Sequence, residues 1–321
     1  MSKSILITGI SGFIGRNVAA ALLKKNTLTA LIRPGTDPRR IAQFKDSVTF
    51  VPIDLTDIPA LTAYLQDASF DAIVHIGALR GGRKYPRSTF FDANVNATEQ
   101  LAIHAKETGA QLLFCSSVGV FGAIPKELPA SSKSPRQQDN YYHFTKIQAE
   151  KIIQNYVLYG LNAAIIRPAI TYGPGDRGFP YTLTKLVDKK LLVLPKTDVI
   201  IHLTNVELLA EAFVKLVDNP SPPGSEFIIA DNHPVSLKKL ADFINQELRG
   251  KEYPASRNIA DSWFSLGEKI ARLLKNELWI SRFELISKSW YYDSDESLKE
   301  LKHSETIPGF RSVIQWYKNN R

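Results

Sequence analysis

Along the first half of the chain, short apolar runs alternate with longer segments in which apolar residues recur at helical spacing. Apolar strands separated by helices are typical of a parallel sheet that is covered on both faces. The pattern therefore predicts an α/β fold, a Rossmann-like doubly wound parallel sheet with helices on both faces. The expected strands are 4–8, 28–32, 48–52, 72–76, 111–115 and 163–166, and the expected helices are 12–24, 58–66, 94–108 and 141–159.

The rhythm changes after Arg167-Pro168, where loop signals rich in glycine and proline interrupt the chain. Helices expected at 206–217, 237–248 and 262–275 alternate there with short strand-like pieces such as 227–230. We therefore expect two domains. The Rossmann-like domain takes residues 1–168, joined by parts of 199–230, and a smaller mixed lobe takes 169–198 and 231–321.

The composition is that of a folded globular protein. Of the 321 residues 44% are hydrophobic and 22% are charged, which excludes disordered, collagen-like and coiled-coil classes. The single cysteine, Cys115, excludes an intramolecular disulfide and a cysteine-rich zinc site, so we expect no metal and a reducing, cytoplasmic location. No leader segment is recognisable, and no run approaches the ~18 apolar residues that a membrane-spanning helix needs. The formal charge of +8 indicates an anionic partner or a solvated basic surface.

A glycine-rich turn, Thr8-Gly9-Ile10-Ser11-Gly12-Phe13-Ile14-Gly15, connects the first expected strand to the first expected helix. Glycines let the backbone approach a pyrophosphate closely, and the following helix presents free N–H groups and the positive end of its dipole. The glycine spacing differs from the commoner dinucleotide fingerprint. Its position between strand and helix nevertheless indicates a dinucleotide site.

The second expected strand ends at Arg33, where an acidic side chain would favour NAD. A guanidinium fits a phosphate bidentately, so we expect NADP, with Arg33 on the 2′-phosphate, helped by Arg16 or Arg39. If Arg33 instead stacks on adenine or is solvated, NAD is possible. Asp54 after the third strand either binds the adenine amino group or belongs to a helix N-cap region.

Tyr142 and Lys146 are one helical turn apart and share a helix face. A nearby ammonium favours the phenolate, which predicts a Tyr142 pKa lowered from ~10 toward neutrality. Such a phenol can exchange a proton with a carbinol or carbonyl oxygen. Ser117, at the end of the preceding strand, is placed to bond the same oxygen.

Over nearly its whole length the chain resembles the extended short-chain dehydrogenase/reductase family, the epimerase/dehydratase group. The motifs that carry this resemblance occur in order: the glycine turn, Asp54-Leu55, His75-Ile76-Gly77-Ala78, Asn94-Val95-Asn96-Ala97-Thr98, Ser116-Ser117-Val118-Gly119-Val120-Phe121-Gly122, the Tyr142/Lys146 pair, and Arg167-Pro168 leading to Tyr172-Gly173-Pro174-Gly175.

The resemblance implies a catalytic triad of Ser117, Tyr142 and Lys146. It also implies that the substrate is a small molecule. Because the cofactor phosphates and the substrate crevice account for the basic residues, we expect no nucleic-acid partner. The predicted cofactor-binding residues are Gly9, Gly12, Phe13, Ile14, Gly15, Arg33, Asp54, Leu55, Gly77, Ala78, Asn94, Tyr142, Lys146, Pro168 and Ile170.

The tail from Trp279 to Tyr317 resembles the 3β-hydroxysteroid dehydrogenase and dihydroflavonol reductase-like branch, and the asparagine that sugar-nucleotide members often carry after the arginine-proline pair is absent. We therefore expect an NAD(P)-dependent oxidoreductase that transfers hydride between nicotinamide and a secondary alcohol or ketone, with Tyr142 as general acid/base. The enzymatic alternative is a sugar-nucleotide epimerase, dehydratase or reductase. The non-enzymatic alternative is a dinucleotide-binding sensor or scaffold, which would not need the triad.

A basic loop at 79–87 follows the fourth strand and contains no acidic residue. It either clamps a phosphate-bearing substrate at the crevice or is an ordinary solvated loop. We predict substrate contacts from Arg80 and Arg83 in this loop, and from Val118 and Tyr172 in the family motifs.

The resemblance further implies a homodimer that pairs through the helices at 94–108 and 141–159. In the smaller lobe, an apolar stripe runs from Trp263, Phe264 and Leu266 through Ile270, Leu273 and Leu274. The stripe predicts a helix face packed against the core of that lobe. The alternative is a helix that lies on a membrane surface.

Overall fold

The computed structural model describes residues 2–80, 85–294 and 304–321. The chain forms two compact units, each described here by itself. The first unit consists of 1–120, 136–168 and 209–229, and the second of 121–135, 169–208 and 230–321.

A seven-stranded sheet, in the order β11-β6-β5-β4-β1-β2-β3, forms the centre of the first unit, and every pairing in it is parallel. The inner strands are mostly apolar, as expected of strands whose two faces are covered by helices. The strands are β1 (Ser4–Thr8), β2 (Thr27–Ile32), β3 (Val48–Pro52), β4 (Ala72–His75), β5 (Gln111–Cys115), β6 (Ala163–Pro168) and β11 (Ser225–Ile229).

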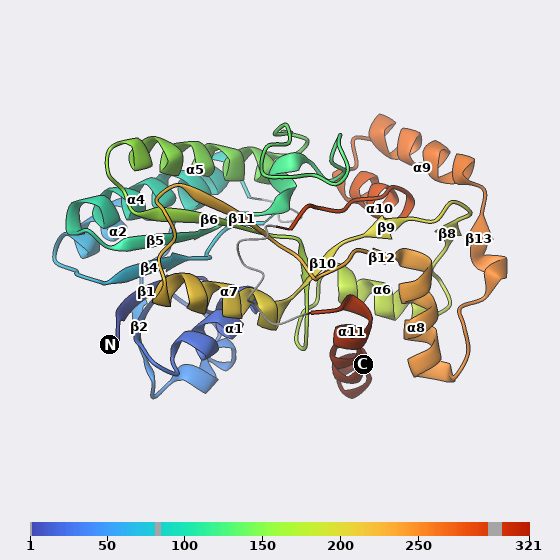
Figure 1. Ribbon diagram of the computed structural model, residues 1–321, viewed down its shortest axis with the longest axis horizontal. Helices are drawn as coiled ribbons and strands as arrows, with labels where there is room; N and C mark the ends of the chain where they lie inside the picture. The colour runs from blue at the N-terminus through green and yellow to red at the C-terminus, as the bar shows by residue number, and fades with distance from the viewer. Residues whose placement is uncertain (1, 81–84, 295–303) are drawn as a thin grey trace. The chain divides into compact units, whose positions relative to one another are not determined.

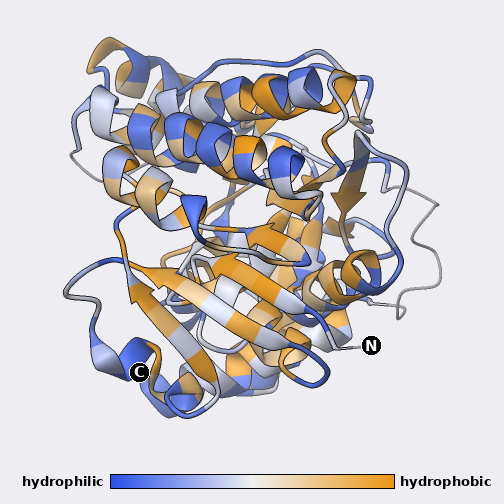
Figure 2. Ribbon diagram, turned by 90° about the vertical axis from the view of Figure 1, so that its left-hand side faces the viewer, coloured by the Kyte–Doolittle hydropathy of each residue, from blue (hydrophilic) through white to orange (hydrophobic). Residues whose placement is uncertain are grey.

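Helices lie on both sides of this sheet, which confirms the predicted doubly wound fold. Figure 1 places α2 (Ile58–Gln66), α4 (Ala97–Thr108) and α5 (Tyr141–Leu158) on one face, and α1 (Phe13–Leu22) and α7 (Val206–Asp218) on the other. The strands of the sheet are mostly hydrophobic, whereas the helix ribbons alternate between hydrophobic and hydrophilic residues (Figure 2). The shorter helices are η1 (Pro38–Arg40), η2 (Ala42–Phe44), α3 (Arg87–Phe91), η3 (Asp92–Asn96) and η4 (Val118–Phe121).

The strand expected at 227–230 is β11, which pairs with β6 at the edge of the large sheet, within the part of 199–230 that was expected to join the Rossmann-like domain. One segment lies elsewhere than the sequence pattern placed it. Residues 121–135, placed by the sequence in the Rossmann-like domain, belong to the second unit. A backbone bridge between Ala130 and Tyr292 holds them there, and these residues are far apart in the sequence.

The second unit combines helices with two-stranded sheets. Its strands pair as β10 with β7, β12 with β9 and β13 with β8. Its elements are β7 (Ile170–Tyr172), α6 (Phe179–Asp188), β8 (Leu194–Pro195), β9 (Ile200–Ile201), β10 (Leu203–Asn205), β12 (Val235–Ser236), α8 (Leu237–Arg249), η5 (Ala255–Arg257), β13 (Asn258–Ile259), α9 (Asp261–Leu273), α10 (Glu277–Ser287) and α11 (Thr306–Asn320). In the ranges that the structure describes, no helix is both long and apolar enough to cross a membrane.

Candidate active site

The glycine turn between β1 and α1 packs its backbone against the end of β4. Gly9 has a φ of 78°, and a Cβ atom on it would lie 2.7 Å from the Gly77 backbone nitrogen. A Cβ on Gly15 would lie 2.1 Å from the Gly9 carbonyl oxygen. Helix α1 begins at Phe13 and has no acidic residue in its first turn. The turn is therefore an open backbone cradle at a positive helix end, which fits the pyrophosphate of a dinucleotide.

A buried chain of hydrogen bonds connects β1 to the turn of helix that precedes α4. The Thr8 hydroxyl accepts bonds from the backbone nitrogens of Ile76 (3.1 Å) and Gly77 (2.8 Å), so its own proton goes to His75 Nδ1 at 2.7 Å. His75 Nε2 then donates to Thr98 Oγ1 at 2.9 Å, and Thr98 donates to the Asn94 carbonyl oxygen at 2.8 Å. In this chain of hydrogen bonds His75 accepts at Nδ1 and donates at Nε2, which requires the neutral form of the imidazole. His75 therefore connects the glycine turn, through Thr8, to Asn94, through Thr98.

We predict that His75 makes the protein less stable in acid. Burial, aided by the charge of Lys146, lowers the pKa of His75 from 6.5 to about 3. The unfolded chain therefore binds one more proton than the folded chain between these values. Above pH 6.5 neutral His75 makes its full contribution to the free energy of unfolding. As the pH falls from 6.5 to about 3, the free energy of unfolding decreases by about 1.4 kcal/mol per pH unit.

Urea unfolding of the wild type and of His75→Asn between pH 7.5 and 4.5 measures this contribution. The variant is less stable at pH 7.5, but its stability falls less steeply as the pH is lowered. Parallel stability curves for the two proteins would contradict the assignment.

Asn94 braces the backbone that follows β4. Its side-chain oxygen accepts from the Leu79 nitrogen at 2.7 Å, and its Nδ2 donates to the Leu79 carbonyl at 2.9 Å and to Thr145 Oγ1 at 3.0 Å. Asn94 is 1% exposed. Asn94, which was predicted to bind the cofactor, thus connects the segment after β4 to helix α5. Both of its amide hydrogens are used in these hydrogen bonds.

Tyr142 and Ser117 lie together at the start of α5. Asn140 caps this helix by accepting from the His143 nitrogen at 2.8 Å, and the helix then carries Tyr142 in its first turn. Ser117 is near enough to Tyr142 to lower the pKa of its phenol. The Ser117 hydroxyl accepts from the Gly119 nitrogen at 3.0 Å. A serine hydroxyl and a tyrosine phenol are therefore neighbours, as an exchange of a proton with one substrate oxygen requires.

The expected lowering of the Tyr142 pKa is wrong for the protein by itself. Burial raises the pKa of Tyr142 to about 12 and outweighs the Ser117 hydrogen bond and the charge of Arg80, which both lower it. A nearby ammonium favours the phenolate, but the loss of solvation on burial opposes its formation more strongly.

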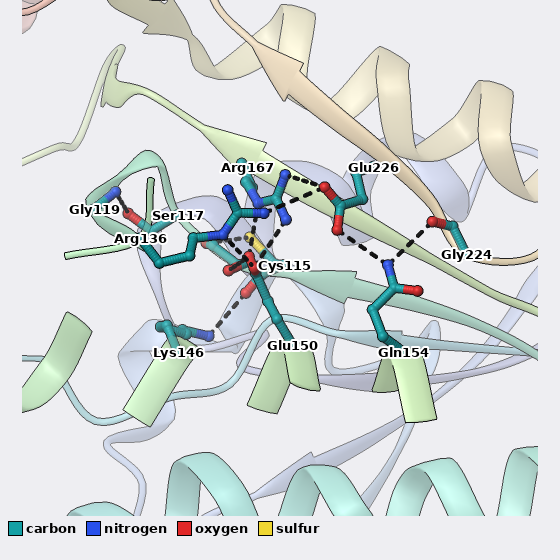
Figure 3. A network of polar contacts seen from close by, with 11 residues as sticks. Cys115, Ser117, Gly119, Arg136, Lys146, Glu150, Gln154, Arg167, Gly224 and Glu226 are labelled. Carbon is teal, nitrogen blue, oxygen red and sulfur yellow. Dashed lines mark hydrogen bonds and ion pairs between the residues drawn. The ribbon is translucent and has the colours of Figure 1, made fainter. Parts of the chain in front are cut away.

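Lys146 points its ammonium group at the backbone of β5 (Figure 3). Its Nζ donates to the Cys115 carbonyl oxygen at 2.8 Å and lies 4.5 Å from the centre of the Phe114 ring. Burial lowers the pKa of Lys146 to about 8, although Glu150 raises it. Cys115 is buried beside this lysine, and burial raises the pKa of its thiol to about 11, consistent with an inert strand residue.

A buried ion network, which the sequence reasoning missed, lies directly behind Lys146 (Figure 3). Arg167 is fully buried and binds Glu150 through Nε (2.7 Å) and Nη2 (2.8 Å). Its Nη1 binds Glu226 of β11 at 2.7 Å, and Arg136 lies 3.6 Å from Glu150 and 3.4 Å from Glu226. The signal was present in the sequence, because Glu150 follows Lys146 by one helical turn.

Arg33 and Asp54, both predicted to contact the adenosine end of the cofactor, bind each other. Arg33 Nε lies 3.0 Å from Asp54 Oδ2, and the two side chains are 49% and 29% exposed. Asp54 Oδ1 accepts from the Thr56 nitrogen and hydroxyl, both at 3.0 Å, while the N-cap of α2 is Asp57. The carboxylate therefore offsets the charge that was expected to attract a 2′-phosphate.

The remaining predicted residues have different surroundings. Val118 is buried beside Ser117, and Arg80 is exposed. Tyr172, in the second unit, has no exposed surface, and its hydroxyl donates to Asp231 at 2.8 Å, so it presents no free group to a substrate. Arg83 lies outside the described residues. The other predicted cofactor residues lie in or next to the turns that follow the strands: Gly12, Phe13, Ile14, Leu55, Ala78, Pro168 and Ile170.

The described residues contain no recognisable site for a metal ion. No group of three or more histidine, cysteine, aspartate or glutamate side chains converges there.

Comparison with known proteins identifies the family. The model of the NAD dependent epimerase/dehydratase family matches residues 5–230. The chain belongs to this family. It is therefore an enzyme of the epimerase/dehydratase family that uses a nicotinamide dinucleotide, and the predicted family resemblance is confirmed. The finer likeness to the 3β-hydroxysteroid dehydrogenase branch stays a prediction.

Individual relatives of this family member include a UDP-glucose 4-epimerase of Vibrio cholerae. It is 27% identical over 251 residues, which cover 75% of this chain and 74% of the relative. Among solved structures, the UDP-glucuronic acid 4-epimerase of Bacillus cereus in complex with NAD is 19% identical, with a TM-score of 0.76 and 99% of each chain covered. The UDP-N-acetylglucosamine 4-epimerase of Methanobrevibacter ruminantium, in complex with UDP-N-acetylmuramic acid, is 18% identical, with a TM-score of 0.76. The two solved structures share the fold.

Proposed function

We propose that the protein is an NAD-dependent 4-epimerase of a nucleotide-linked sugar, with Tyr142 as the general acid/base. The observation that carries this proposal is the similarity to the Vibrio cholerae UDP-glucose 4-epimerase, which extends over three quarters of the chain. The sequence favoured a reductase of secondary alcohols and ketones and kept a sugar-nucleotide epimerase as its alternative. The comparisons support that alternative better.

The reaction divides into two mirror-image halves. Tyr142, as the phenolate, takes the proton of the sugar C4 hydroxyl while the C4 hydrogen leaves with its electron pair, which gives a 4-ketosugar. A bound nicotinamide dinucleotide would supply the hydride acceptor for this half and the hydride donor for the return half. After the sugar presents its other face, Tyr142 gives the proton back to the C4 oxygen, and Ser117 donates a hydrogen bond to that oxygen in both halves.

An assay of the full chain with UDP-glucose, UDP-N-acetylglucosamine and UDP-glucuronic acid tests this proposal. We expect proton NMR to show the C4 epimer of at least one of them, with no net change of NADH absorbance. Stoichiometric oxidation of NADH or NADPH by ketones, with no epimer formed from any of the three sugars, would support the reductase instead.

NAD rather than NADP is the cofactor that we propose. Asp54 pairs with Arg33, and its carboxylate beside the guanidinium repels a 2′-phosphate that would otherwise bind there. The relative from Bacillus cereus is described in complex with NAD.

Removing the Asp54 carboxylate should shift the cofactor preference toward NADP. In Asp54→Asn, Arg33 is freed to bind a phosphate, so we expect the NADPH dissociation constant to fall by about tenfold, as one charge-assisted hydrogen bond would give. Binding of NADH and NADPH followed by fluorescence measures this. Asp67→Asn, at the other end of α2, is the control and should leave both constants unchanged. A wild type that binds NADPH more tightly than NADH would contradict the proposal.

The homodimer through α4 and α5, the cytoplasmic location and the substrate contacts of Arg80 and Val118 stay predictions.

A further inference from the structure

Helix α9 exposes a continuous apolar face. Trp263 is 64% exposed, Leu266 48%, Ile270 50%, Leu273 82% and Leu274 71%. At 100° per residue these five side chains cover an arc of about 100° on one side of the helix. The prediction that the stripe faces the core is wrong for these five side chains and is confirmed only for Phe264, which is buried.

A different face of α9 makes the contact with its own unit. Phe264 and Ala271 are buried, and a Cβ on Gly267 would lie 2.6 Å from the Phe283 ring of α10. Figure 1 shows α9 running beside α10. Because other residues of α9 already pack against its own unit, the exposed stripe is an additional apolar surface and is not needed for folding of the unit.

Two glutamates of the α9–α10 pair are held in ion pairs, and each is 13% exposed. Glu268 binds Arg272 at 2.8 Å and Lys288 at 2.7 Å, and Glu284 binds Arg272 at 2.6 Å. Asp261, at the start of α9, is exposed and accepts from the Lys196 backbone nitrogen at 2.9 Å.

The basic side chains beside the stripe are left facing solvent. Lys269 and Lys275 are exposed and make no ion pair with the described residues. Arg282 is exposed and lies 5.1 Å from the ring of Trp279, which is itself 48% exposed. The outward side of α9 therefore combines large apolar groups, tryptophan and positive charge.

We infer that the exposed face of α9 is a docking surface for an anionic lipid bilayer. A helix of this kind lies in the plane of the interface, with tryptophan and leucine among the acyl chains and lysine beside the headgroups. Charge complementarity favours lipid over a second copy of the chain. Two copies meeting at this face would bring the lysines of like charge together, and each chain carries a net charge of +8. The inference is independent of the proposed function, since it concerns a helix outside the catalytic residues.

Co-sedimentation of the full chain with vesicles tests the inference. We expect binding to vesicles of phosphatidylcholine mixed with phosphatidylglycerol and much weaker binding to pure phosphatidylcholine. The variant Leu266→Ser/Ile270→Ser/Leu273→Ser should bind at least about tenfold more weakly, because three side chains no longer enter the interface. Lys269→Gln/Lys275→Gln should bind about tenfold or more weakly and with less dependence on salt.

The matched control removes exposed apolar side chains elsewhere on the molecule. Leu158 and Leu191 are 82% and 58% exposed, and Leu158→Ser/Leu191→Ser should bind vesicles like the wild type. Absence of wild-type binding, or equal binding by the α9 triple variant, would overturn the inference. A concentration-dependent dimer that the triple variant abolishes would instead identify a second copy as the occupant. No substrate is needed in these measurements, so their outcome does not depend on the epimerase assay.

Discussion

Replacing Tyr142 by phenylalanine will lower turnover by about a thousandfold while the protein stays folded. The substitution removes only the hydroxyl that takes and returns the proton, and general acid–base catalysis of this kind contributes roughly 10²–10⁴ in rate. Because Tyr142 packs at the start of α5 with its ring retained, its neighbours have no new cavity to fill. The measurement is kcat for epimerisation of the best UDP-sugar by NMR, together with the thermal unfolding midpoint.

Tyr141 provides the matched control for this experiment. It lies about 100° away around the same helix and packs against Phe90 and Phe144, with ring centroids 6.1 Å and 5.4 Å away. Tyr141→Phe should retain turnover within a few-fold. If Tyr142→Phe also retained turnover, a different residue would have to move the proton, and the proposed role of Tyr142 would fail.

Replacing Arg167 by methionine will lower the free energy of unfolding by about 3–5 kcal/mol, the range for breaking a buried ion pair by removal of one partner. The side chain is fully buried and neutralises Glu150 and Glu226 (Figure 3). Its loss leaves two carboxylates close together, and Arg136, the nearest other cation, is farther from both. Urea unfolding measures the change.

Two further variants decide whether the loss comes from the uncompensated charges. Neutralising the partners as well, in Arg167→Met/Glu150→Gln/Glu226→Gln, should restore part of the stability because no buried charge then lacks a partner. Arg311→Met removes an arginine that pairs with Glu247 at 3.0 Å on the surface, where it is 63% exposed, and should cost no more than about 1 kcal/mol. Equal losses in Arg167→Met and Arg311→Met would show that the buried network contributes little.

The elements of the first unit follow from local patterns, and so they could be predicted. The strand expected at 48–52 is β3 with the same bounds, and the strand expected at 111–115 is β5. β5 is buried along its whole length because both faces of the sheet are covered there, and a short window of the sequence displays this property, whereas the edge strand β3 is partly exposed. The helix expected at 141–159 ends one residue earlier, at Leu158.

The interactions that the sequence did not disclose join residues that are distant in the chain. Arg33 was expected to bind a phosphate, but the fold places the Asp54 carboxylate 3.0 Å from it. Glu226 joins the network behind Lys146 only because β11 pairs with β6. The sign of the Tyr142 pKa shift depended on burial, which a helical spacing does not report.

The sequence by itself therefore determined the parallel sheet, the cofactor turn and the candidate catalytic residues, because periodicity and motif spacing are properties of contiguous segments. Only the tertiary structure decided which charges meet, how deeply Tyr142 and Lys146 are buried, and that the apolar stripe of α9 faces outward. Helical periodicity in the sequence shows that α9 has apolar residues, but it does not show which of them pack against the rest of the unit. Contacts with other elements decide this, such as the contact of Gly267 with Phe283 of α10.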